Sequence, residues 1–274
     1  MTTPTRPPTR RRIARYGWVA DLPDARDHLF SAPRIALAAL PPSADVSGTL
    51  PPCYDQGRIG SCTANAIAGA FEFALRKQEL ADFMPSRLFI YYNERAVEGH
   101  PHTDSGAQIR DGPRSVGKQG VCAETEWPYD DTPADESTGL FPAGARDGER
   151  PADQCYTDAL SNRAITYQRV TQHLDQLRGC LAAGYPFVFG FTVYDSFESQ
   201  QVALTGEAQL PQPGEQVLGG HAVLATGYDD SQQRFLVRNS LGTGWGKDGY
   251  FGMPYAYLTD RGLASDFWTV RVVN

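Results

Sequence analysis

Residues 55–75 read DQGRIGSCTANAIAGAFEFAL, a glycine-punctuated loop that runs directly into a stretch of small and apolar residues. Apolar side chains recur in that stretch every three or four positions, which is the spacing of one helix face. Few polar residues interrupt it, so the helix is predicted to be buried. It should begin near Cys62, with Ser61 as its N-cap.

The start of a helix is a favourable place for a reactive cysteine. Free backbone N–H groups and the positive end of the helix dipole favour thiolate over thiol, which lowers the pKa of a cysteine such as Cys62. Gln56, on the preceding loop, can direct its amide N–H toward a negatively charged oxygen beside the backbone N–H of Cys62. A free cysteine is more often a small buried side chain, so this segment alone leaves both interpretations open.

Two later segments contain the partners that such a thiol needs. Residues 219–228 (GGHAVLATGY) place His221 at the start of an apolar strand, and residues 236–246 (LVRNSLGTGWG) place Asn239 at the end of the next one. The short polar connection between them predicts an antiparallel hairpin that brings the two side chains together. One imidazole nitrogen can then donate to Asn239 while the other faces Cys62.

The rest of the chain changes character about half-way. Helical spacing comes first, and strand-like apolar runs follow, which together predict an α+β protein of two lobes. The additional helices are expected at 86–98, 108–118 and 172–183, and the additional strands at 186–194, 234–238 and 267–273. The expected division is an N-terminal segment at 1–50, a helical lobe at 51–160 that carries the cysteine helix, and a β-rich lobe at 161–274.

In this order, the segments around Cys62, His221 and Asn239 resemble the papain family of cysteine peptidases. The run 127–129 (WPY) resembles the aromatic-Pro-Tyr sequence of that family, and the form GSCTAN resembles its bacterial, xylellain-like members. The resemblance implies a papain-like fold, in which a helical lobe and an antiparallel β-rich lobe enclose the active-site cleft. It implies a cysteine endopeptidase with Cys62 as nucleophile and His221 as base. Asn239 would orient the histidine, and Gln56 would be the oxyanion donor.

The chain departs from papain itself at three positions. Thr63 stands where papain has a tryptophan, and Ile59 stands where it has a disulfide cysteine, so that family disulfide cannot form here. Leu241 replaces the tryptophan that shields the Asn–His hydrogen bond from water. Shielding is therefore expected from a smaller apolar group or from Trp245.

The cysteine and histidine residues outside the proposed triad are not arranged as a metal site, so we expect neither a metal nor a cofactor. None of the five cysteines lies in a close pair with zinc-site spacing. His100 and His102, near Asp104, are interpreted as solvated histidines. The sequence cannot choose a pairing among the remaining cysteines, which are expected to be buried thiols or to form at most one disulfide; they are Cys53, Cys122, Cys155 and Cys180.

Charge and hydropathy argue against several classes of partner. The chain has 25 basic and 32 acidic residues and a net charge of -7, which disfavours nucleic acid. No stretch approaches the roughly 18 apolar residues that span a bilayer. No secretory signal peptide is recognisable, so the compartment stays open between the cytoplasm and export by a route without such a signal. The expected partner is a protein or peptide substrate.

The N-terminal segment 1–50 is rich in proline and has no long periodic apolar pattern. Its residues 16–33 carry aromatic and acidic side chains without a core of their own. They are expected either to fold back over the cleft as an inhibitory pro-region or to form a surface strap.

Two other functions use the same residues. One is a non-catalytic binding protein on a peptidase scaffold, and the other is an acyltransferase that joins chains through the same triad. An amine-competition product assay distinguishes the acyltransferase from a peptidase.

Overall fold

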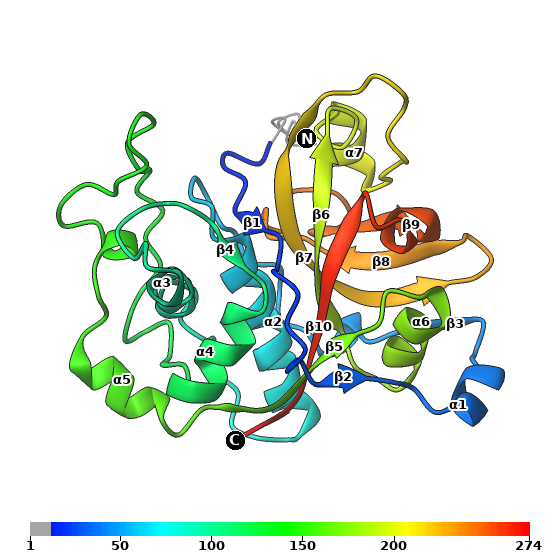
Figure 1. Ribbon diagram of the computed structural model, residues 1–274, viewed down its shortest axis with the longest axis horizontal. Helices are drawn as coiled ribbons and strands as arrows, with labels where there is room; N and C mark the ends of the chain where they lie inside the picture. The colour runs from blue at the N-terminus through cyan, green and yellow to red at the C-terminus, as the bar shows by residue number, and fades with distance from the viewer. Residues whose placement is uncertain (1–11) are drawn as a thin grey trace, which may run out of the picture.

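The computed structural model describes residues 12–274, so residues 1–11 of the N-terminal segment lie outside it. In Figure 1 helices gather on the left and strands on the right, the α+β arrangement that the sequence predicts. The helices of the left side are α2 (Cys62–Lys77), α3 (Arg87–Glu98), α4 (Asp111–Gln119) and α5 (Asp153–Ala159). The remaining helices are α1 (Arg34–Ala38), η1 (Ser47–Thr49), η2 (Arg146–Gly148), α6 (Leu174–Ala182), α7 (Gln200–Thr205) and α8 (Tyr255–Thr259).

One mixed sheet forms the right side, in the order β2-β5-β10-β6-β7-β8-β9, and β3 adds to β7 outside this path. Every neighbouring pair is antiparallel except β2 with β5. The strands are β2 (Leu29–Phe30), β3 (Ser43–Asp45), β5 (Ala164–Val170), β6 (Phe187–Tyr194), β7 (Val217–Asp229), β8 (Arg234–Arg238), β9 (Tyr250–Pro254) and β10 (Ala264–Val273).

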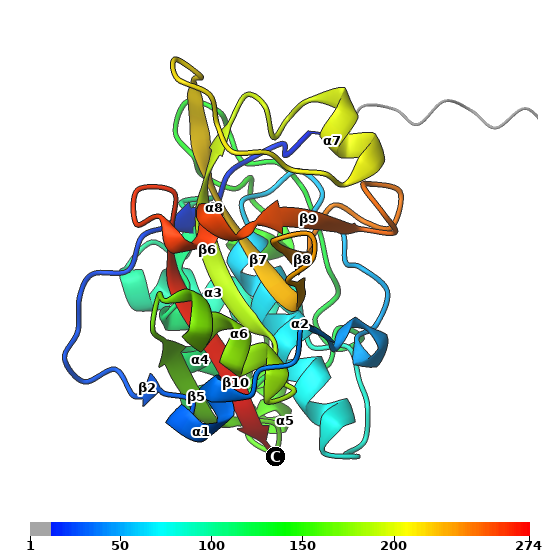
Figure 2. The same ribbon diagram turned by 90° about the vertical axis from the view of Figure 1, so that its right-hand side faces the viewer.

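The alternation of side chains along β6 explains how the two sides join. Phe187, Phe189 and Phe191 all enter one apolar cluster, which also contains residues of α6. Val188, between them, enters the other cluster, which is built around α2. Successive strand residues point to opposite faces, so α2 and α6 cover opposite faces of the sheet, as Figure 2 shows.

We propose that the lobe boundary lies near residue 160, between α5 and β5.

Most of the predicted elements are present, and their bounds show where the sequence signal was weak. The helix predicted at 108–118 begins only at Asp111, because Gln108 belongs to β4 (Ala107–Gln108). The sequence pattern does not predict β5 or β9. In β5 (AITYQRV) polar and apolar residues do not alternate regularly, and β9 contains Gly252 and Pro254, residue types that are unusual inside strands.

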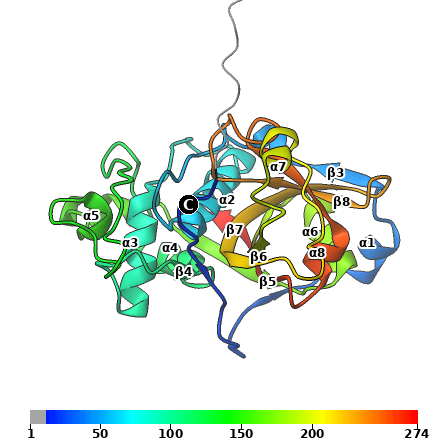
Figure 3. The same cartoon turned by 90° about the horizontal axis from the view of Figure 1, so that it is seen from above.

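The N-terminal segment passes between the two sides of the molecule (Figures 1 and 3). Its β1 (Trp18–Val19) pairs in parallel with β4 on the helical side. Further along the chain, β2 pairs with β5 at the edge of the main sheet. No helix within residues 12–274 is both long enough and apolar enough to cross a membrane.

Candidate active site

The loop before α2 is held in place by polar contacts from both sides of the molecule. The N–H of Gln56 donates to the carbonyl of Ser240 at 2.8 Å, and the N–H of Gly60 donates to the Asp104 carboxylate at 2.9 Å. These contacts place Cys62 at the first position of α2. Ser61 occupies the N-cap position, but its side chain makes no capping bond and instead meets the hydroxyl of Tyr129 at 2.5 Å.

The hairpin of β7 and β8 brings His221 and Asn239 together. The antiparallel register pairs Leu224 with Arg238, so Asn239 continues toward the start of β7. Nε2 of His221 lies 2.8 Å from Oδ1 of Asn239. Nδ1 has no hydrogen-bond partner among residues 12–274, and the ring of Phe191 packs edge-on against the imidazole at 5.7 Å between centroids.

The contact of α2 with β7 brings the cysteine to the histidine. The N–H of Ala222, the residue after His221, lies 3.4 Å from Sγ of Cys62. Cys62, His221 and Gln56 have no exposed surface, and Asn239 is 3% exposed. The four residues singled out in the sequence therefore meet where α2 crosses the sheet.

The orientation of the Gln56 amide is set by a hydroxyl on the opposite wall. Its Oε1 accepts a hydrogen bond from Oγ of Ser240 at 2.6 Å, which turns Nε2 away from that wall. Nε2 donates to the carbonyl of Ile59 at 3.0 Å and lies 3.5 Å from the carbonyl of Arg15. An amide donor in this position can stabilise a carbonyl oxygen that becomes negatively charged.

Residues 13–18 lie across this site. The carbonyl of Gly17 accepts from the N–H of Ala107 at 2.8 Å, and a Cβ on Gly17 would overlap the carbonyl of Gly60. Arg15 forms a salt bridge of 3.0 Å with Asp104, whose side chain is fully buried. The segment is thus bound closely to the cysteine loop.

The aromatic side chains of the same segment, Tyr16 and Trp18, pack against strands β6 and β7 of the sheet. A Cβ added at Gly190 or Gly220 would lie 2.0 Å or 2.6 Å from the ring of Trp18, and one at Gly219 would lie 2.5 Å from Tyr16. These glycines make room for the two rings. Nε1 of Trp18 also donates to Oδ2 of Asp266 at 3.2 Å.

A family model described as Papain family cysteine protease matches residues 40–267. The chain belongs to the papain family of cysteine peptidases. A crystal structure of xylellain, a cysteine protease from Xylella fastidiosa, matches it over 100% of both chains with 48% identity and a TM-score of 0.91. An uncharacterized peptidase C1-like protein of Acanthamoeba polyphaga mimivirus is 39% identical over 94% of this chain and 87% of its own length. A procathepsin B from Trypanosoma congolense, at 19% identity, shares the fold with a TM-score of 0.67 over 87% of this chain and 80% of its own.

The predicted papain-like fold and peptidase class are thereby confirmed, but the expected low pKa of the cysteine is wrong for the covered site. Burial raises the pKa of Cys62 to about 12, against the opposing effect of backbone N–H groups from Ala222 and Gly17. Burial also lowers the pKa of His221 to about 4, although its bond to Asn239 acts in the opposite direction. In this covered papain-family site, burial therefore favours a neutral thiol on Cys62 and a neutral imidazole on His221.

Several side chains that support the papain-family site were not identified from the sequence. Ser240 orients Gln56, Phe191 packs on His221, and the hydroxyl of Tyr129 donates to the carbonyl of Gln56 at 2.9 Å. The run WPY that contains Tyr129 was a signal for the family, but it did not reveal this contact. Phe191 looks like any other apolar residue of β6, and no local pattern shows that Ser240, two residues after the end of β8, contacts Gln56.

Other residues noted in the sequence have different surroundings. Nδ1 of His102 lies 2.8 Å from the carbonyl of Gly148, and Asp104 binds Gly60 as described above. Leu241 and Trp245 are buried, and Trp245 packs on Phe251 at 5.6 Å between centroids.

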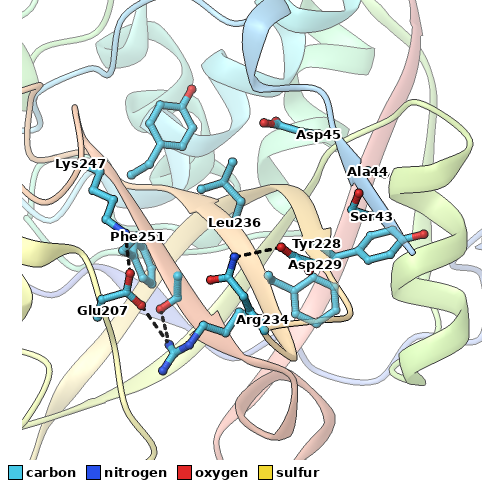
Figure 4. Close-up of a pocket in the computed structure, with 14 residues that line it drawn as sticks. Ser43, Ala44, Asp45, Glu207, Tyr228, Asp229, Arg234, Leu236, Lys247 and Phe251 are labelled. Carbon is cyan, nitrogen blue, oxygen red and sulfur yellow. Dashed lines mark hydrogen bonds and ion pairs between the residues drawn. The ribbon is translucent and has the colours of Figure 1, made fainter. Parts of the chain in front are cut away.

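A cavity of about 420 Å³ lies away from the cysteine, between β3 and β7–β9 (Figure 4). Glu207 at its edge pairs with Lys247 at 2.5 Å and with Arg234 at 3.7 Å. None of the four predicted site residues lines it. One cavity that contacts Asn239 has a volume of only about 10 Å³, too small for a substrate side chain.

Proposed function

We propose that this papain-family peptidase cleaves peptide bonds with Cys62 as nucleophile, His221 as general base and acid, and Asn239 as the group that orients the imidazole. The observation that carries the proposal is the 2.8 Å contact between Nε2 of His221 and Asn239. It leaves Nδ1 as the imidazole nitrogen available to the thiol of Cys62. Gln56 and the backbone N–H of Cys62 would stabilise the oxyanion.

The proposed reaction proceeds in two steps. His221 takes the proton of Cys62, and the thiolate attacks the carbonyl carbon of a peptide bond. The C–N bond then breaks, and the imidazolium gives its proton to the leaving amine. Water, activated by His221, hydrolyses the thioester and releases the acid. Nε2 donates to Asn239 throughout, which keeps Nδ1 directed toward the sulfur.

Two variants test these assignments. Cys62→Ala should abolish turnover of a fluorogenic peptide, and Gln56→Ala should lower kcat by roughly a hundredfold to a thousandfold, the usual loss for one oxyanion donor. Cys180→Ala is the matched control, because Cys180 belongs to α6 and is buried in the other apolar cluster, away from the site. Measurable hydrolysis by Cys62→Ala would rule out the mechanism.

The N-terminal segment is proposed to restrain the enzyme. Support comes from the burial of Cys62, from the carbonyl of Arg15 near Nε2 of Gln56, and from the neutral state that burial imposes on the thiol. A substrate would have to replace residues 13–18. Departure of the segment would return water to the site and permit the thiolate–imidazolium pair.

The structure limits where the segment can be removed for a test. Phe30 and Ala32 belong to the buried cluster of the β-rich side, so truncation to residue 40 would damage the core as well as uncover the site. A chain that begins at Asp21 keeps both residues, and it also keeps the contacts of the buried Asp21 side chain. Its Cys62 should react faster with a thiol-directed epoxide, as measured by peptide mass mapping. Equal labelling rates in the folded full-length and shortened chains would contradict the restraint and leave the triad assignment intact.

A further inference from the structure

Two of the cysteines lie side by side at the far end of the helical side. The sulfurs of Cys122 and Cys155 and a carboxylate oxygen of Glu126 all lie within 4.8 Å of one another. Cys122 follows the turn after α4, and Cys155 lies in the first turn of α5. Cys122 has no exposed surface and Cys155 is 4% exposed.

The other cysteines are in different surroundings. Sγ of Cys180 lies 3.6 Å from the carbonyl of Tyr185, and Cys53 packs against Gly249. Cys62 belongs to the active site. The sequence could not choose which cysteines would pair in a disulfide. Their positions in the fold leave Cys122 and Cys155 as the pair that lies close together.

We propose that Cys122 and Cys155 form a disulfide when the protein folds under oxidising conditions. The thiolate of one cysteine attacks a low-molecular-weight disulfide such as oxidised glutathione and releases one thiol. The second cysteine then attacks the mixed disulfide and releases the other thiol. Two electrons pass from the protein to the small disulfide, and the two cysteine protons leave with the two released thiols or the solvent.

The surroundings of the pair favour a neutral disulfide over a metal site. Both sulfurs belong to the apolar cluster around α2, and burial raises the pKa of Cys122 well above its usual range, with the nearby Cys155 adding to the effect. A metal would need both thiols deprotonated in these apolar surroundings, whereas a disulfide carries no charge. Because the native thiols are buried, the exchange is expected during folding, when a small disulfide can reach them.

The bond would join the two ends of residues 123–154, the segment that supports the cysteine loop. Tyr129 in this segment donates to the carbonyl of Gln56 and contacts Ser61, and Arg87 lies over its ring at 3.8 Å. Closing the segment restricts the unfolded chain and so stabilises the native state. The existence of the disulfide does not depend on the proposed catalytic roles.

Peptide mapping tests the pairing directly. Full-length Cys62→Ser protein, which cannot digest itself through Cys62, is refolded with oxidised and reduced glutathione and alkylated in denaturant. Digestion should then yield one linked pair of peptides that contains Cys122 and Cys155, lighter by two hydrogens than the free pair. Cys53 and Cys180 should carry the alkyl group.

A stability measurement gives an independent readout. Reduction should lower the Tm of the parent protein by about 7 °C, the scale expected for a loop of this size in a chain of this length. The Tm of the Cys122→Ser/Cys155→Ser variant should not respond, while Cys53→Ser/Cys180→Ser should behave as the parent does. Peptides that contain Tyr129 should exchange amide hydrogens faster in the Cys122→Ser/Cys155→Ser variant.

Several results would overturn the inference. Alkylation of both Cys122 and Cys155 after glutathione refolding would show that the bond does not form, even where the double variant fails to fold. Pairing of either cysteine with another residue would show a different connectivity. Retention of one zinc ion in native mass spectrometry, lost when Glu126→Gln is introduced, would show a metal site instead.

Discussion

Trp18→Phe should release the N-terminal segment without altering the catalytic residues. The change keeps an aromatic ring beside Gly190 and Gly220 but removes the N–H that donates to Asp266. A hydrogen bond to a charged group contributes about 1.5–3 kcal/mol. Asp266 retains the N–H of Asp21 and the guanidinium of Arg169 as donors, so we expect the lower end of that range.

A loss of about 1.5 kcal/mol corresponds to roughly a tenfold change in equilibrium constant. While the covered form dominates, the labelling rate of Cys62 is proportional to the uncovered fraction. Trp18→Phe should therefore react with a thiol-directed epoxide about ten times faster than the parent. Trp18→Ala also loses burial of the ring, about another 1.5–3 kcal/mol, and should react about a hundredfold faster or more.

Leu22→Ala is the matched control, because Leu22 lies in the same segment but is 71% exposed. It should label at the parental rate. Folding of each variant is checked by circular dichroism before the rates are compared. Parental labelling rates for both folded Trp18 variants would refute the claim that this segment controls access to Cys62.

Three further predictions concern residues around the site and the buried Glu94 of α3. Gly190→Ala places a Cβ 2.0 Å from the Trp18 ring, so it should accelerate labelling in the full-length chain but not in one that begins at Asp21; acceleration in both would locate the effect elsewhere. Ser240→Ala removes the donor that orients Gln56 and should lower kcat about tenfold, the scale of one hydrogen bond, with little change in KM; an unchanged kcat argues against this role. Burial raises the pKa of Glu94 well above its ordinary value, so the folded protein keeps a proton on this carboxyl group that unfolding releases. The parent should therefore lose stability relative to Glu94→Gln as the pH rises from about 4.5 toward neutral. Parallel plots of Tm against pH for the two proteins across that range would contradict this prediction.

The local sequence was sufficient for the elements with strong periodic signals. The small residues of α2, the alternating phenylalanines of β6 and the hairpin of β7 and β8 each carry a pattern that one segment can show without the rest of the fold. Short or polar strands such as β5 and β9 carry no such pattern, because neighbouring strands rather than their own residues stabilise them. They became visible only in the assembled sheet.

The identity of the candidate site residues was determined in the sequence, because Cys62, His221, Asn239 and Gln56 lie in segments with distinctive glycine and apolar patterns. The pKa values of Cys62 and His221, in contrast, are shifted by burial in the tertiary structure. A pKa depends on how much water reaches a group, and the backbone N–H groups that act on Cys62 belong to Gly17 and Ala222, which lie far from it in the chain. The proximity of Cys122 to Cys155 is likewise a property of the fold, since it depends on how the turn after α4 lies against α5 and not on the spacing of the two residues.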